Sequence, residues 1–216
     1  MPIFYSFKRC PYAMRARMAL YLSKTVVELR EVSLKNKPQP MLEISPKGTV
    51  PVLLLDDGSV IDESIEIIEW CIKKKKDIFK DTLNKEQELS AEDAIKLFDE
   101  KFKFHLDRYK YATRYEDVDE ILHRDSCVEI LKTMEKKISK NKFFYTNHVN
   151  KIDICILPFI RQFRIANPEW FDRQNEFQKV QKWLDSFLKS SILEEIMVSH
   201  EVWKKDNPAI FFPTNL

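Results

Sequence analysis

One stretch of the chain has the residue types for covalent sulfur chemistry: CPYAMRARMAL, residues 10–20. Its strong helix formers predict a helix that begins near Pro11, and proline is tolerated in a first turn because that N–H has no helical partner. Cys10 then faces the positive end of the helix dipole and free N–H groups, which stabilise a thiolate and lower the thiol pKa. Lys8 and Arg9 add positive charge. Cys10 is therefore the candidate nucleophile.

The alternative for Cys10 is a buried structural thiol, and we expect that role for the three cysteines inside apolar helical patterns: Cys71, Cys127 and Cys155. No metal site is predicted, because His123 and Cys127 supply two ligands where zinc takes three or four. The sequence has only two glycines, Gly48 and Gly58. Glycine-rich phosphate loops need more, so nucleotide sites of those kinds are excluded.

Two further stretches combine a structural and a binding interpretation. In GTVPVLLL, Pro51 either starts a strand or forms a cis bond that turns the backbone N–H and C=O of Val50 toward an open site. In DES, residues 62–64, the side chains either cap a helix or help to bind a ligand. In the second case the helix N–H groups and the Ser64 hydroxyl bind a carboxylate, and Glu63 pairs with an amine. The sequence leaves both alternatives open.

Hydrophobic periodicity divides the chain into two parts. In the first eighty residues the order is β-α-β, a connection, then β-β-α. From about Asp81 apolar residues recur at three- and four-residue steps, which predicts helices. The predicted fold is an α/β N-terminal thioredoxin-like domain (βαβ-ββα), residues 1–77, followed by an all-α helical C-terminal domain, residues 85–216. Strands are predicted at residues 3–5, 26–34, 51–55 and 59–61, and helices at residues 13–22 and 63–76.

Composition limits the classes of partner. The 216 residues carry 36 basic and 34 acidic side chains, a net charge of +2, so no overall field attracts nucleic acid or an anionic membrane. No apolar run approaches the ~20 residues of a membrane span. The N-terminus lacks the features of a signal peptide, and the widely spaced cysteines suit a reducing compartment. We therefore expect a cytoplasmic protein with no nucleic acid or membrane partner.

Taken together, the motifs resemble the glutathione transferase superfamily over nearly the whole chain. CPYAMRARMAL, LKNKP, GTVPVL and DES stand in that family's order and spacing. The similarity is greatest to the cysteine-type members, the omega class and bacterial omega- or beta-related proteins. NKIDICILPFIRQF, residues 150–163, resembles the buried helix of the second domain, which begins with a capping box formed here by Asn150 and Asp153.

This resemblance implies a glutathione site around Cys10, with glutathione as co-substrate and no metal. Cys10 would form a mixed disulfide with glutathione, and the backbone of Val50, before a cis Pro51, would pair with its cysteinyl part. Tyr5 and Ser6 lie where other classes carry a thiol-activating hydroxyl, so they are minor candidates.

The same resemblance implies which residues contact the rest of the glutathione tripeptide. Glu63 and Ser64 would hold the γ-glutamyl end. Lys37 would meet the glycyl carboxylate, with Leu34 beside it. Tyr12 would place an aromatic ring near the sulfur.

Position 13 bears on the mechanism, because similar glutaredoxins carry a second cysteine where this chain has Ala13. A second glutathione must then resolve the mixed disulfide at Cys10. This favours a glutathione-dependent thiol transferase or reductase, acting on mixed disulfides or in dehydroascorbate-type reduction. The alternatives are a non-catalytic binding or regulatory protein and an enzyme that conjugates glutathione to electrophiles.

The expected partners are a small disulfide or electrophile and a second copy of the chain, since the resemblance implies a homodimer. The acceptor substrate would meet the helical domain. Five aromatic residues are candidates for that side, although a core or interface position is the better interpretation of each one taken singly: Phe102, Tyr109, Tyr111, Trp170 and Trp203.

Overall fold

The computed structural model describes residues 1–138 and 141–214, and it separates the chain into two compact units. The first unit contains residues 1–78 together with residues 189–216, and the second contains residues 79–188. The first holds the sheet and every residue predicted to bind glutathione.

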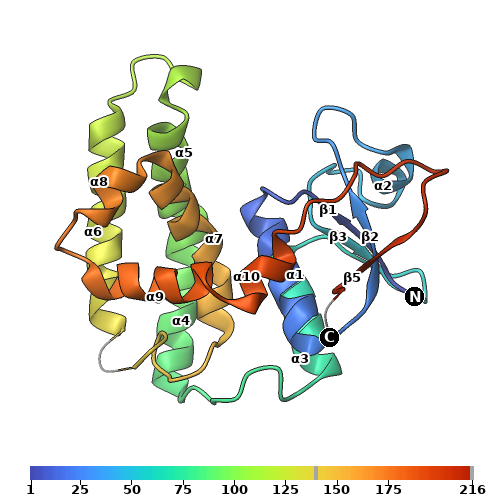
Figure 1. Cartoon of the computed structure of the whole chain (residues 1–216), viewed down its shortest axis with the longest axis horizontal. Helices are drawn as coiled ribbons and strands as arrows, with labels where there is room; N and C mark the ends of the chain where they lie inside the picture. Colours follow the sequence, from blue (N-terminus) through green and yellow to red (C-terminus); the bar gives the residue numbers. More distant parts are fainter. Residues whose placement is uncertain (139–140, 215–216) are drawn as a thin grey trace. The chain divides into compact units, whose positions relative to one another are not determined.

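A five-stranded mixed sheet forms the centre of the first unit (Figure 1). Its order is β4-β3-β1-β2-β5. β1 runs parallel to β2, and the other three pairs of neighbours are antiparallel. The strands are β1 (Ile3–Ser6), β2 (Val27–Glu31), β3 (Val52–Leu54), β4 (Val60–Ile61) and β5 (Ile210–Phe212).

The helices of the first unit are α1 (Pro11–Ser23), α2 (Gln39–Ile44), α3 (Ser64–Lys74) and α10 (Ser191–Ile196). α1 makes the parallel crossover from β1 to β2 and packs against α3 and α10. Figure 1 shows α1 and α3 side by side. Proline occupies the first turn of α1, as predicted, and Lys24 ends the helix in the left-handed conformation.

Two elements of this unit were absent from the sequence-based prediction. α2 lies in what was interpreted as a connection, where Pro38 is the N-cap and Pro40 falls in the first turn. β5 interrupts a half of the chain that was predicted to be wholly helical. It pairs with Val27–Leu29 of β2, so residues 189–216 lie with the sheet and not with the second unit.

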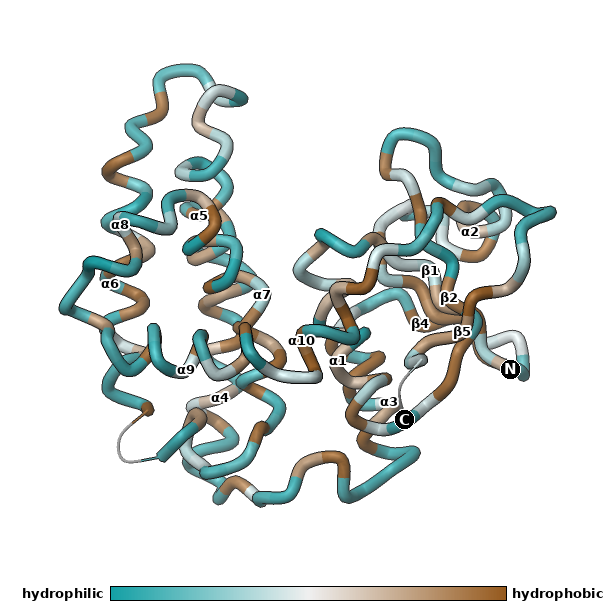
Figure 2. Tube along the Cα trace, in the orientation of Figure 1, coloured by the Kyte–Doolittle hydropathy of each residue, from teal (hydrophilic) through white to brown (hydrophobic). Residues whose placement is uncertain are grey.

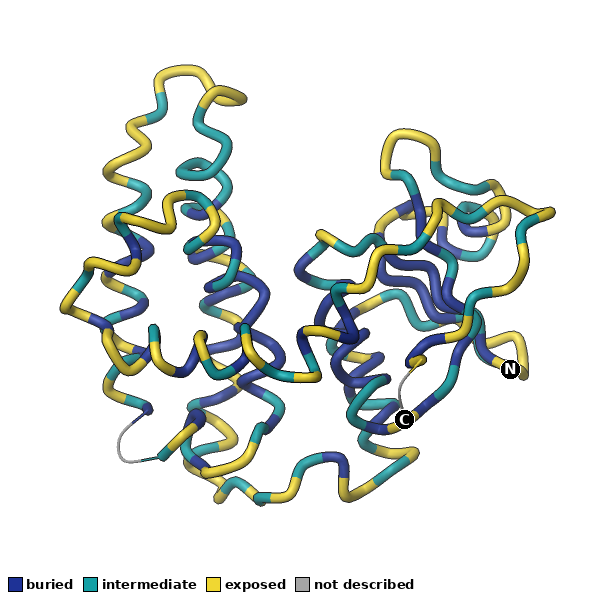
Figure 3. Tube along the Cα trace, in the orientation of Figure 1, coloured by how far each residue is buried: buried dark blue, intermediate teal, exposed yellow. Residues whose placement is uncertain are grey.

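The central strands β1 and β3 are mostly apolar (Figure 2) and mostly buried (Figure 3). One core cluster lies beside the β1–α1 loop and consists of Tyr5, Val32, Met41, Val50 and Val52. Cys10, half-buried, packs against this cluster. The sulfur is thus fixed against the edge of the core.

All described regular elements of the second unit are helical, as predicted. α4, a π-helical turn and α5 follow one another without a break, and α7 is buried along most of its length and packs on α4, α5 and α9. The elements are α4 (Lys85–Leu97), η1 (Phe98–Phe102), α5 (Lys103–Lys110), η2 (Ala112–Arg114), α6 (Glu120–Lys137), α7 (Lys151–Ala166), α8 (Pro168–Asp172) and α9 (Gln178–Leu188).

The predicted capping box at the start of α7 is confirmed. The Asn150 side chain accepts from the N–H of Ile152, and the Asp153 carboxylate accepts from the N–H of Asn150 at 2.9 Å. Asp153 also accepts from the N–H of Phe144 at 3.2 Å and from Trp183 Nε1 at 2.8 Å. Burial raises the pKa of Asp153 to about 7, although these donors act to lower it. The carboxyl group ties α7 to two distant segments of the unit.

No helix in the described part of the chain is both long and apolar enough to span a bilayer.

Candidate active site

Cys10 is the N-cap of α1, in extended conformation. Its carbonyl accepts the first helical hydrogen bond, from Met14 at 3.0 Å, and its own N–H donates to the Phe7 carbonyl at 2.9 Å. The Sγ atom donates to the Val50 carbonyl oxygen at 3.5 Å. The sulfur therefore stands at the positive end of α1, beside the backbone of the segment before β3.

The Val50–Pro51 peptide bond is cis. Two residues earlier, Gly48 has φ +62, a left-handed conformation that favours glycine. A Cβ atom at Gly48 would lie 3.6 Å from Lys37 Nζ. The predicted residue Lys37 thus lies beside the short segment 45–50, which ends at the predicted residue Val50 and which Cys10 contacts.

Glu63 and Ser64 start α3, Glu63 as the exposed N-cap and Ser64 as the buried first residue. Lys47 Nζ lies 2.5 Å from Glu63 Oε1 and donates to the Asp62 carbonyl at 3.1 Å. Hydrogen bonding to Glu63 raises the pKa of Lys47, and the charges of Glu63 and Asp62 add to it. Lys47 was not among the predicted site residues, although it directly precedes Gly48 in the sequence.

The segment 45–50 therefore joins the predicted residues. It contacts Asp62 through the Ser45 hydroxyl at 2.7 Å, Glu63 through Lys47, and Cys10 through the Val50 carbonyl. Three stretches far apart in the sequence converge on one short loop. The Cys10 thiol, the cis peptide before Pro51 and the N-terminus of α3 are thereby brought together around this loop.

Tyr12, in α1, and Leu34, after β2, are the remaining predicted binding residues of the first unit. The Arg15 guanidinium carbon is 5.4 Å from the centroid of the Tyr12 ring. Leu34 is 47% exposed in the turn between Ser33 and Asn36. Their contribution to a ligand site stays a prediction.

The hydroxyls of Tyr5 and Ser6 both accept hydrogen bonds from arginines. Arg30 Nη1 donates to the Tyr5 hydroxyl at 2.7 Å, and Arg17 Nε donates to the Ser6 hydroxyl at 2.8 Å. Both of these bonds come from arginine side chains and not from the sulfur of Cys10, so they support a structural use of the two hydroxyls.

Comparison with known families decides the nature of this domain. Residues 4–77 match the family described as glutathione S-transferase, N-terminal domain. This chain carries a glutathione S-transferase N-terminal domain. The matched range runs from β1 through α3 and includes Cys10, Val50, Glu63 and Ser64.

One relative extends the likeness beyond the transferase N-terminal domain, and a second matches over a shorter stretch. The chain is 24% identical over 210 residues to glutathione S-transferase omega-1 of Rattus norvegicus, covering 93% of this chain and 82% of the relative. It is 36% identical over 66 residues to a probable glutathione S-transferase DHAR1, cytosolic, of Oryza sativa subsp. japonica, covering 31% of this chain and 30% of the relative.

A solved structure agrees with this assignment of the fold. Glutathione transferase Omega 3C of Trametes versicolor superposes with a TM-score of 0.77 at 17% identity, over 93% of this chain and 85% of that one. The predicted resemblance to the glutathione transferase superfamily, and the fold it implied, are confirmed.

The other cysteines of this transferase-like chain are buried. Burial raises the pKa of Cys71 to about 11, and it also raises the pKa of Cys127, whose Sγ donates to the Phe102 carbonyl. Cys155 is buried in α7. Among the described residues, no three His, Cys, Asp or Glu side chains gather as a metal site would require.

The aromatic candidates for an acceptor side do not form one group. Phe102 is buried and stacks on Phe98 with centroids 4.4 Å apart, so it is a core residue. Tyr109 and Trp170 both contact Phe163, which Phe102 also contacts. The remaining two lie elsewhere: Tyr111 is contacted by Arg114, and Trp203, in the transferase domain's unit, is contacted by Arg30.

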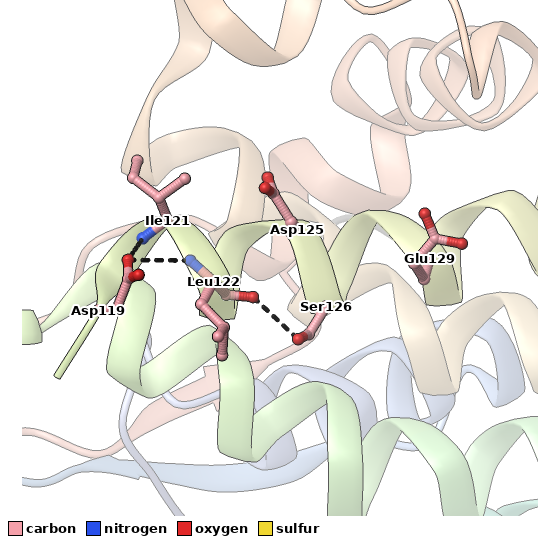
Figure 4. Close-up of a pocket in the computed structure, with 6 residues that line it drawn as sticks. All are labelled: Asp119, Ile121, Leu122, Asp125, Ser126 and Glu129. Carbon is pink, nitrogen blue, oxygen red and sulfur yellow. Dashed lines mark hydrogen bonds between the residues drawn. The ribbon is translucent and has the colours of Figure 1, made fainter.

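A shallow hollow lies along α6 in the second unit (Figure 4). Asp119 caps the helix by accepting from the N–H groups of Ile121 and Leu122, and Ser126 donates to the Leu122 carbonyl. The Asp119 and Ser126 side chains already make hydrogen bonds within the helix, so we assign no chemistry to this hollow. It is lined by Asp119, Ile121, Leu122, Asp125, Ser126 and Glu129.

Proposed function

We propose that the chain is a glutathione-dependent thiol transferase that acts through Cys10. The observation that carries this proposal is the position of the Cys10 sulfur, at the N-terminus of α1 and 3.5 Å from the Val50 carbonyl. The family resemblance assigns the Val50 backbone to the cysteinyl part of glutathione. A glutathione held there would bring its sulfur to Cys10.

In the first step, the Cys10 thiolate attacks the glutathionyl sulfur of a mixed disulfide between glutathione and a small thiol. The Cys10–glutathione disulfide forms, the original disulfide bond breaks, and the released thiolate takes a proton from water. The helix N-terminus stabilises the attacking thiolate, which is the reactive form of the residue.

In the second step, the thiolate of a second glutathione attacks the glutathionyl sulfur of that intermediate. Oxidised glutathione leaves, and Cys10 returns to the thiolate. Ala13 occupies the position of a resolving cysteine, so this intermolecular step replaces an internal disulfide. The net reaction reduces the mixed disulfide and oxidises glutathione.

The remaining contacts to glutathione follow from the residues around segment 45–50. Ser64 and the free N–H groups at the start of α3 would bind the γ-glutamyl carboxylate. Glu63 would bind the amine, in competition with Lys47. Lys37 would pair with the glycyl carboxylate.

The test combines turnover with peptide-resolved alkylation. Glutathione-dependent reduction of the cysteine–glutathione mixed disulfide is measured for the parent protein and for Cys10→Ala. In parallel, iodoacetamide labelling of each cysteine is followed against pH by mass spectrometry. Buried Cys71, Cys127 and Cys155 act as internal controls in the same sample.

Turnover lost in Cys10→Ala, with a Cys10 pKa below the ~8.5 of a free cysteine, supports the proposal. Turnover retained in Cys10→Ala contradicts it. If the parent protein reduces no disulfide, conjugation of glutathione to 1-chloro-2,4-dinitrobenzene separates a conjugating enzyme from a binding protein.

We also propose a cytoplasmic location and a homodimer. The location is supported by the reducing-compartment cysteine pattern and by the word cytosolic in the rice relative's name. The dimer is supported by exposed apolar side chains on the helices of the second unit, among them Leu89, Phe104, Ile121 and Leu122.

A further inference from the structure

A buried ion pair links α1 to the end of β2 in the first unit. The Arg17 and Glu31 side chains are 1% and 8% exposed, and Arg17 Nη2 contacts Glu31 Oε2. A period-two pattern places Glu31 on the same buried face of β2 as Val27 and Leu29. A buried ion pair is weak evidence for stability, because desolvation offsets the attraction. Its position suggests another use.

Arg17 lies on the same face of α1 as Cys10, the residue at which the helix begins. Seven residues are almost two helical turns, so the two side chains leave the helix in nearly the same direction. Helical side chains tilt toward the N-terminus, and a long arginine therefore reaches back toward Cys10. Its Nε donates to the Ser6 hydroxyl at 2.8 Å, which confirms that direction because Ser6 precedes the loop to Cys10.

The same pair holds the loop that carries Cys10. Glu31 Oε1 accepts from the backbone N–H of Lys8 at 2.6 Å. Arg17 holds Ser6, and the N–H of Cys10 donates to Phe7. The buried ion pair thus holds this loop at Ser6 and at Lys8, just before Cys10.

Arg17 also makes a hydrogen bond to the C-terminal end of α10. Its Nη1 donates to the carbonyl of Ile196, the last residue of that helix, at 2.9 Å. Every nitrogen of the guanidinium group has a hydrogen-bond acceptor. A planar group with several partners is held firmly, so its charge stays at a constant place relative to Cys10.

Charge connects Arg17 with the thiolate. Burial lowers the pKa of Arg17, whereas the negative charges of Glu31 and of ionised Cys10 raise it. The interaction is mutual, so a positive Arg17 favours the Cys10 thiolate. The hydrogen bond from Cys10 Sγ to Val50 acts in the opposite sense, because it exists only in the thiol form. The other charged groups around these elements are Lys8, Arg9, Glu195 and His200.

We propose that Arg17 is a positioning residue for Cys10: with Glu31 it fixes the β1–α1 loop, and its charge favours the thiolate. This inference rests on the proposed function of Cys10 as the nucleophile. Glu31 neutralises part of the arginine charge and so moderates the effect.

The experiment follows alkylation of Cys10 by iodoacetamide against pH in the full chain, read on the Cys10 peptide. Arg17→Gln should raise the midpoint by about one pH unit, a roughly tenfold loss of thiolate at pH values below it. Arg17→Lys should restore most of that shift. Glu31→Gln should lower the midpoint, because the arginine charge is no longer neutralised.

Arg15→Gln is the matched control. Arg15 is equally buried on α1, but it lies roughly 140° around the helix from Cys10 and its guanidinium contacts Tyr12. We expect its midpoint to equal that of the parent protein. Loosening of α1 in general would instead move the Arg15 and Arg17 variants alike.

A raised midpoint in Arg17→Gln together with a lowered midpoint in Glu31→Gln supports the proposal, and the reverse pair of shifts contradicts it. An unchanged midpoint in folded Arg17→Gln, or shifts of the same sign in both variants, overturns it. If Arg17→Gln does not fold, Glu31→Gln decides alone: a lower midpoint supports the proposal, and an equal or higher one refutes it. The alkylation midpoint is measured without turnover. Retained activity in Cys10→Ala would therefore refute the proposed function, whereas the effect of Arg17 on Cys10 would still be decided by the midpoints.

Discussion

Lys47 Nζ lies 2.5 Å from Glu63 Oε1, so the carboxylate predicted to bind the amine of glutathione already has a cationic partner. Both side chains are substantially exposed, so this pair is the solvent-exposed part of the contact between segment 45–50 and the start of α3. A ligand amine must share or displace Lys47.

Removing either partner of this pair should change glutathione binding in opposite directions. Glu63→Gln removes the charge that attracts the amine, so KM for glutathione rises. Lys47→Gln removes the competitor, so KM falls, by at most about fivefold because exposed ion pairs contribute roughly 0–1 kcal/mol. Steady-state kinetics at varied glutathione measures both. A rise in KM for both variants would show that Lys47 shapes the site and does not compete for it.

Gly48 should be the more sensitive of the two glycines. Both have positive φ, +62 at Gly48 and +86 at Gly58, so alanine is strained at each. At Gly48 a Cβ would also lie 3.2 Å from Leu42 Cδ2, whereas nothing lies within 4 Å at Gly58. Gly48→Ala should cost more than the ~1–2 kcal/mol of left-handed strain alone, and Gly58→Ala about that amount.

Urea denaturation of the two alanine variants tests this difference. Equal losses in the free energy of unfolding would show that the neighbouring Leu42 side chain yields at no cost.

Asp153 should make stability depend on pH. Its pKa in the folded protein is about 7, above the ~3.9 of an unfolded aspartate. Between those values the folded chain holds a proton that the unfolded chain has lost, so the free energy of unfolding falls as pH rises through this window. The loss is at most about 4 kcal/mol, the equivalent of three pKa units.

Asp153→Asn removes this titration. The difference in unfolding free energy between the parent protein and the variant, measured in urea at pH 5 and pH 8, should be larger at pH 5. An equal difference at the two pH values would mean that Asp153 is ionised throughout, held so by the N–H groups of Asn150, Phe144 and Trp183.

The proposed homodimer should depend on the exposed apolar residues of α6. Leu122 is 57% exposed on that helix, and a charge there would oppose burial in an interface. Leu122→Glu should therefore shift sedimentation from dimer to monomer. Ile165→Glu is the control, because Ile165 is 45% exposed on α7 and not on α6, and it should sediment as the parent protein does. Sedimentation of the parent protein as a monomer would refute the dimer outright.

Local sequence signals were sufficient for the elements that carry the site. Pro11 and the helix formers after it place Cys10 at the start of α1, and the Asn150–Asp153 spacing predicts the cap of α7. Such signals act within one or two turns of chain, so they can be read without the fold. The succession of β1 to β4 along the chain follows in the same way from short apolar runs, one period-two stretch and the turn residues between them.

Other features depend on residues brought together from distant parts of the chain. β5 has three residues and is a strand only because β2 supplies its partner. Arg17 and Glu31, 14 positions apart in sequence, can both be buried because helix and strand turn them to one place. Lys47 meets Glu63 because the loop before β3 passes the start of α3. The sequence by itself determined which residue is the nucleophile candidate and what element it begins. Only the tertiary structure decided which charges surround it, because partners are selected by packing and not by spacing along the chain.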